Sequence, residues 1–241
     1  MIQVAIILML LTLVGSFPLG KRIPNATRGK FSTALNYNDL PTIEQVSTDS
    51  FTDQAYYAST IVKELVLASS NVISNHNYEP GQLQKLQDLV TIQLSHQDGI
   101  RGFFSAYLTQ EGDDTPADAE CMPVPLSKAM KCVDMALLAP LACMNVIRPV
   151  AMSYWHKDPT LKENSAKTAE RGKKILTSLR GSVNFVRNFE AIYAITSGSK
   201  AANVDEKLYK LWDGVFRESN YSKEQKNAIA RTFADFLAVK N

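Results

Sequence analysis

The chain has 241 residues, of which 45% are hydrophobic and 21% are charged, and its 26 basic and 24 acidic side chains leave a formal net charge of +2. This composition excludes an intrinsically disordered chain, because the apolar surface is large enough to offset the entropy of ordering. The small net charge excludes a general electrostatic affinity for nucleic acid, so we expect no nucleic-acid partner.

Charge is unevenly distributed along the chain. Residues 1–156 carry 10 basic and 14 acidic side chains, whereas residues 157–241 carry 16 basic and 10 acidic ones. The C-terminal third therefore offers a basic surface to an anionic partner, or it simply contains solvated helix faces.

The chain opens with an apolar segment. Val4–Val14 contains one polar residue, Thr12, and small residues follow as far as Ser16, which is typical of a secretory signal peptide. The basic residues follow this segment instead of preceding it, which favours an uncleaved anchor with its N-terminus outside. In that case residues 2–19 tether the chain to a membrane. We predict a secreted or membrane-anchored protein with a signal peptide or signal-anchor over residues 1–16, and we leave cleavage and membrane orientation open.

Two Asn-x-Ser/Thr sequons are compatible with the secretory route. They are Asn25-Ala26-Thr27 and Asn220-Tyr221-Ser222. A chain of this length often contains one or two such triplets by chance, so they add little to the prediction of export.

The first half of the chain begins with an irregular region. Residues 17–50 are rich in Pro, Asn, Thr, Ser and Gly and show no sustained period, so we expect an irregular lead-in. Apolar residues at helical spacing then predict helices over 53–75, from 83 to about 98, and over 100–108. The acidic loop, residues 110–120, follows with five acidic and no basic side chains.

The second half also shows helical periodicity. Residues 126–148 are almost continuously apolar and predict a buried helix, which Pro140 should kink or end. Pro149 marks a further break. Four later helices are expected, over 169–179, 185–193, 208–215 and from Ser222 onward, where Gln225 has the spacing of a capping box.

No alternating pattern typical of a strand occurs. We therefore predict an all-α fold, in which residues 51–241 form one globular bundle of about seven or eight helices.

The stretch from His96 to Gly102 combines an imidazole, a carboxylate and a guanidinium. His96, Asp98 and Arg101 are candidates for acid–base work or anion binding. The alternative is a helix C-terminus, where His96 favours the negative end of the dipole and Gly99 supplies a left-handed stop.

A basic stripe lies near the C-terminal third. Lys167, Arg171 and Lys174 have the spacing i, i+4 and i+7, so they line one face of a helix. This face is the candidate ligand or partner surface, and the alternative is a solvated helix face.

The three cysteines are eleven residues apart. Cys132 and Cys143 are too far apart along a straight helix to pair, so a disulfide would join Cys121 to Cys132 or to Cys143. The alternative is that the thiols are free and act as small hydrophobic groups. Five methionines lie in the same segment, and we expect them to fill the core, with no metal bound. The alternative is a soft-metal carrier that binds copper(I) through the sulfur atoms of this segment.

No motif identifies a reaction, since the sequence contains no GxSxG, HExxH, Gly-rich phosphate loop or paired CxxC. We expect no cofactor and a binding or interaction protein, whose partner is an unidentified protein or an anionic surface. The alternative is an enzyme or small-ligand-binding protein that uses His96, Asp98 and Arg101 in a cleft between helices.

Overall fold

The computed structural model describes residues 40–47, 50–70, 80–112, 115–199 and 204–238, and all the regular structure in these ranges is helical. The predicted all-α fold is therefore confirmed, with ten helices in the described ranges instead of seven or eight. The N-terminal apolar segment, with its possible cleavage site, and the sequon at Asn25 lie outside the described residues.

The helices differ widely in length, from one turn to 21 residues. In chain order they are α2 (Ile43–Val46), α3 (Phe51–Ser70), α4 (Pro80–Gln93), α5 (Gln97–Thr109), α6 (Val124–Cys132), α7 (Met135–Trp155), α8 (Pro159–Leu179), α9 (Val183–Ser197), α10 (Glu206–Ser219) and α11 (Lys223–Ala238).

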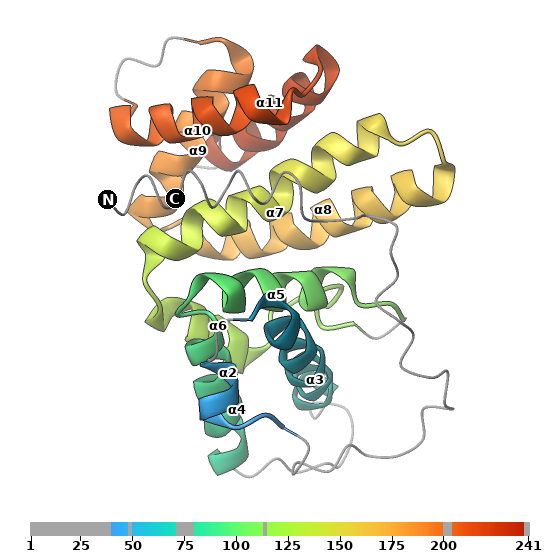
Figure 1. The fold of residues 1–241 in the computed structure, drawn as a ribbon, viewed down its shortest axis with the longest axis vertical. Coiled ribbons are helices and arrows are strands. Elements are labelled where there is room, and N and C mark those ends of the chain that lie inside the picture. The colour runs from blue at the N-terminus through green and yellow to red at the C-terminus, as the bar shows by residue number, and fades with distance from the viewer. Residues whose placement is uncertain (1–39, 48–49, 71–79, 113–114, 200–203, 239–241) are drawn as a thin grey trace.

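The helices form two groups on either side of the α7–α8 hairpin (Figure 1). Helices α2 to α6 lie on one side, where α5 packs against α3 and also touches α7 and α8. Helices α9, α10 and α11 lie on the other side, and both α9 and α11 pack against α7. The hairpin therefore joins the two halves of the core.

Helix α7 continues through both of its prolines, so it does not end at Pro140, and the break predicted at Pro149 is wrong. Each proline lacks one backbone N–H and leaves one helical hydrogen bond unmade. Burial of the surrounding apolar side chains opposes this cost, because residues such as Leu138 and Ile147 are fully buried. Packing thus overrides the local preference of proline.

The break between helices lies earlier than predicted. The apolar run 126–148 is divided at Val133 and Asp134, where α6 ends and α7 begins. The Asp134 side chain accepts a hydrogen bond from the backbone N–H of Ala136 at 2.8 Å and so caps α7.

Two capping boxes occur in the described residues. Helix α2 has one between Thr42 and Gln45, so the lead-in predicted to be irregular contains a helical turn. The box predicted at the last helix is confirmed: Gln225 Oε1 accepts from the backbone of Ser222 at 2.8 Å, and Ser222 Oγ accepts from the backbone of Gln225 at 3.3 Å.

Candidate functional site

Helix α8 supplies one wall of the candidate site. It begins with Pro159 in its first turn, and the Asp158 side chain caps it by accepting from the backbone N–H of Leu161 at 3.0 Å. The predicted basic stripe does lie on one face of this helix. That face is turned toward the acidic loop, which forms the opposite wall.

Arg171 is the centre of this contact. It is only 4% exposed, and its Nε donates to Asp118 Oδ1 at 2.7 Å while Nη2 donates to Oδ2 of the same carboxylate. Its remaining donors bond the backbone oxygens of Leu108 and Gln110, both at 2.8 Å, and Thr115 Oγ1 at 3.0 Å. A buried guanidinium with this many acceptors holds the end of α5 and the acidic loop against α8.

The two lysines of the stripe reinforce the same contact. Lys174 Nζ donates to the backbone oxygens of Asp118 at 2.8 Å and Ala119 at 3.1 Å, and Lys167 lies 3.2 Å from Asp118 Oδ2. The Arg171 hydrogen bonds are the largest of the effects that hold the pKa of the Asp118 carboxyl well below its usual range. We call Lys167, Arg171, Lys174, Asp118 and Thr115 the latch.

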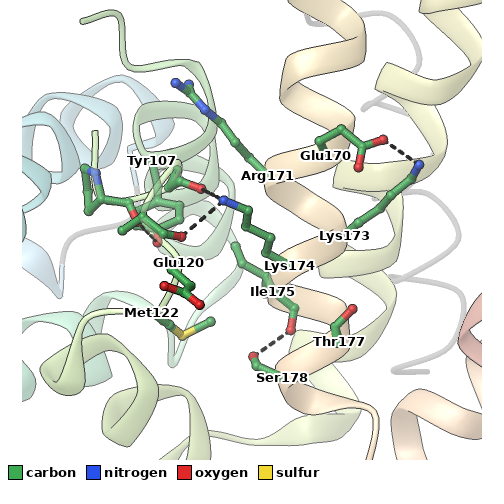
Figure 2. A pocket seen from close by; sticks show the side chains of 13 residues that line it. Tyr107, Glu120, Met122, Glu170, Arg171, Lys173, Lys174, Ile175, Thr177 and Ser178 are labelled. Atoms are coloured by element: carbon green, nitrogen blue, oxygen red, sulfur yellow. Dashed lines mark hydrogen bonds and ion pairs between the residues drawn. The ribbon is translucent and has the colours of Figure 1, made fainter. Parts of the chain in front are cut away.

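A groove of about 450 Å³ lies beside the latch, between α8 and the loop (Figure 2). The loop side contributes Pro116, Ala117, Ala119, Glu120 and Met122, together with Tyr107 from α5. The α8 side contributes Glu170, Arg171, Lys173, Lys174, Ile175, Thr177 and Ser178. The latch therefore sets the width of the groove.

The groove combines an apolar base with a charged rim. Tyr107 and Ile175 are each 2% exposed, and Tyr107 donates to the backbone oxygen of Pro116 at 3.1 Å. Burial raises the pKa of the Tyr107 hydroxyl, which therefore stays protonated. Lys173 and Glu170, which also line the groove, form an ion pair of 2.7 Å whose two side chains are partly exposed (Figure 2).

The three candidates at the start of α5 have structural contacts. His96 is the N-cap of α5, so the predicted helix C-terminus at this point is wrong. Its Nδ1 accepts from the backbone N–H of Gly99 at 3.2 Å, which leaves Nε2 to donate to the backbone oxygen of Val46 at 2.9 Å. Gly99 lies inside the first turn of α5, and the structure needs no left-handed stop there.

Asp98 and Arg101 pair with each other. Their side chains are 2.8 Å apart, and the Arg101 guanidinium also lies over the ring of Phe51, 4.7 Å from its centroid. Neither the α8 groove nor the second hollow described below is lined by His96, Asp98 or Arg101. The structure thus assigns them to capping and to the packing of α5 on α3.

The three cysteines are free in the structure, so the predicted bridge from Cys121 to Cys132 or Cys143 is not formed. Cys121 and Cys132 are exposed, whereas Cys143 is fully buried in α7. Burial raises the pKa of the Cys143 thiol, which acts there as a small hydrophobic group.

A second, more open hollow of about 630 Å³ lies between the end of α7 and helices α9 and α11. Tyr154, Tyr193 and Arg231 are among its lining residues, and Arg231 donates to the Tyr154 hydroxyl at 3.2 Å. Unlike the α8 groove, this hollow has no wall formed by an irregular loop that a buried charged residue holds in place. We therefore take the α8 groove as the candidate site.

The described residues meet few of the requirements of a metal site or a membrane span. They contain no group of three or more His, Cys, Asp or Glu side chains placed to hold a metal ion. One described helix, α7, is long and apolar enough to cross a membrane, but 61% of its apolar stretch is buried inside the fold. This burial agrees with its place between the two halves of the core.

Sequence reasoning identified the basic stripe but missed its partner. Asp118 and the groove beside it depend on the acidic loop folding back onto a helix some 50 residues later in the chain. The opposite charges of the acidic loop and the stripe were a usable signal for this contact.

Comparison with known proteins identifies a family for this chain. The model of a family described as Uncharacterised conserved protein UCP020893 matches residues 63–236, which run from α3 into α11 and include the latch and the groove. No curated protein and no solved structure matches the chain.

Proposed function

We propose that this chain, which belongs to the UCP020893 family, is an exported helical protein that binds a partner protein through the α8 groove. The observation that carries this proposal is the groove itself, with an apolar base, a charged rim and a wall fixed by buried ionic contacts.

The chemistry of the groove favours a protein segment as the ligand. Met122 and the buried Ile175 and Tyr107 offer an apolar base for one or two side chains. Lys173 and Glu170 at the rim present both signs of charge, which suits the polar border of a protein interface. An anionic surface is less well matched, because Arg171 is buried and Lys174 already donates to loop carbonyls.

Rigidity of the groove also supports a binding role. A loop of eleven residues loses much conformational freedom when it binds, and this loss lowers affinity. Here Arg171 and Lys174 already bond the described part of the loop, at Gln110 and within residues 115–119, before any partner arrives. The entropic cost of ordering these residues on binding is therefore lower.

Export is the second part of the proposal. It rests on the apolar segment Val4–Val14, which precedes the region that the family model matches. In this proposal the mature protein is either released after cleavage behind Ser16 or anchored through residues 2–19 with the helical domain on the outer side of the membrane.

The binding role is tested by blocking the groove. Ser178 is exposed, lines the groove and bonds only the backbone oxygen of Ile175, so we expect Ser178→Arg to fold normally and to obstruct binding. Thr160→Arg is the matched control, since Thr160 is exposed on the same helix and outside the groove. Tagged proteins purified from the native host should co-purify a partner with the wild type and with Thr160→Arg, at least ten-fold more than with Ser178→Arg. Equal recovery with all three would refute the groove as the binding surface.

Export is tested separately by intact mass. The protein should be recovered from the medium without residues 1–16, or from the membrane fraction at full length with its helical domain open to protease added outside the cell. A full-length chain found only in the soluble cell interior would refute export.

A further inference from the structure

We propose that Asn220 is an N-glycosylation site, at which a secretory oligosaccharyltransferase attaches a glycan in a host that has this pathway. This inference rests on the proposed export, because a chain that stays inside the cell never meets the enzyme. It concerns a surface turn that is separate from the α8 groove.

The sequon lies in a surface turn between two helices. Asn220 is the C-cap of α10 and lies in the surface turn that leads into α11. Its side chain is exposed, and no hydrogen bond to it is formed within the described part of the chain. An Asn-x-Ser/Thr triplet marks a real acceptor only when it lies on a surface loop, and this one does.

The backbone at Asn220 has a left-handed conformation. Asn220 has φ 47° and ψ 40°, which makes it the one described residue other than glycine with a positive φ. Asparagine tolerates this left-handed conformation better than most residues do. Asparagine is therefore well suited to this position in the turn.

The three sequon residues differ in their exposure to solvent. Tyr221 is half-buried, and its ring packs edge-on against Phe216 with centroids 5.9 Å apart. Asn220 and Ser222 on either side are exposed. The Ser222 hydroxyl is engaged only with local groups of α11, donating to Glu224 at 2.8 Å. A glycan on Asn220 can thus extend into solvent without displacing the core.

The reaction balances without any redox partner. The Asn220 Nδ2 forms a bond to the anomeric carbon of a lipid-linked oligosaccharide, and the bond from that carbon to the diphosphate oxygen breaks. The lipid diphosphate leaves with the electron pair, and the amide proton passes to a base of the transferase or to water.

The test uses the full chain secreted from a eukaryotic host, with Thr27→Ala present throughout to remove the other sequon. One version keeps its own N-terminus, and a second carries a signal peptide of known cleavage in place of residues 1–16. Asn220→Asp is the matched variant without the amide, because aspartate also tolerates the left-handed conformation. Ser222→Thr keeps the hydroxyl that the sequon requires.

We expect both versions to lose mass on treatment with peptide N-glycosidase, with Asp at position 220 of the released peptide. Ser222→Thr should be modified at least as fully, and Asn220→Asp not at all. The site itself would be overturned if the chain with the replaced signal peptide were secreted without modification, both as wild type and as Ser222→Thr. If only the chain with the replaced signal peptide is modified, the native chain is not exported. The proposed export and the modification of the native chain would then both be overturned.

Discussion

Arg171 is charged and 4% exposed, and its guanidinium donors bond five acceptor atoms on the acidic loop and the end of α5. Placing an ion in the interior is costly unless nearly every donor is paired. Here the pairing ties the C-terminal end of one helix to the middle of another, so the same contacts that stabilise the fold also shape the groove.

Removal of this side chain should be strongly destabilising. We predict that Arg171→Leu lowers the free energy of unfolding by about 3–5 kcal/mol, because Asp118 and the loop carbonyls lose their buried donor. The control Lys173→Leu removes a lysine that pairs at the surface, and it should cost less than about 1 kcal/mol. Urea denaturation at pH 7 measures both values, and similar costs for the two variants would show that the latch has no special role.

The latch also predicts a dependence on pH. The pKa of Asp118 is lowered in the folded protein, so the unfolded chain takes up the proton first, at about pH 4. The stabilisation is therefore complete above that pH and is lost as the pH falls. We expect the difference in unfolding free energy between wild type and Asp118→Asn to be largest at pH 7 and to shrink below about pH 4. A difference that stays constant from pH 7 to pH 3 would disprove this account.

At the residue scale, part of the site was open to prediction. The spacing of Lys167, Arg171 and Lys174 correctly placed them on one helix face, because helical period depends only on local geometry. The burial of Arg171 was not predictable, since it depends on a loop that precedes it by about fifty residues. His96 was misassigned for a similar reason, as an imidazole can occupy either end of a helix.

Among the elements, the contact between α3 and α5 is unusually close. Gly102 of α5 lies against the α3 backbone, and a Cβ there would be 2.6 Å from the carbonyl carbon of Gln54 and 2.7 Å from the nitrogen of Ala55. Real Cβ atoms do not approach backbone so closely, so the two helices would have to separate.

We therefore predict that Gly102→Ala destabilises the protein by about 1–3 kcal/mol. Gly214 is the matched control, because it lies inside α10 and a Cβ there meets nothing within 4 Å. Gly214→Ala should be neutral or stabilising by up to about 1 kcal/mol, since alanine favours the helix. Thermal unfolding of both variants provides the comparison, and an unchanged melting temperature for Gly102→Ala would contradict the packing described here.

It was easier to predict that a segment is helical than to predict where its helix begins and ends. Periodicity identified α3, α4, α5, α9, α10, α11 and the second half of α8, because an apolar stripe is a local property of the sequence. The continuity of α7 through Pro140 and Pro149 was not predictable in the same way, as it depends on burial by helices from both halves of the chain. The break at Asp134 had a local signal, a capping aspartate, which the apolar run concealed.

At the scale of the whole molecule, α7 and α8 connect the two groups of helices. Trp212 is fully buried in α10 and reports on one group, whereas far-ultraviolet circular dichroism reports on all helices. In a Trp155→Phe background, which removes the exposed tryptophan, both signals should give the same unfolding midpoint in urea. Separate midpoints would mean that the two groups unfold independently and that the hairpin does not couple them.

The binding role of the groove is the central claim, and site-specific photo-crosslinking in the native host tests it most directly. A photoreactive amino acid at Ser178 should join the protein to a defined partner, and the same group at Thr160 on the same helix should not. The crosslinked peptide of the partner should carry an apolar side chain at the point of attachment, because the base of the groove is formed by Tyr107 and Ile175. Identical adducts from the two positions, or none from Ser178 in a folded and correctly localised protein, would contradict the claim that the groove binds a partner protein.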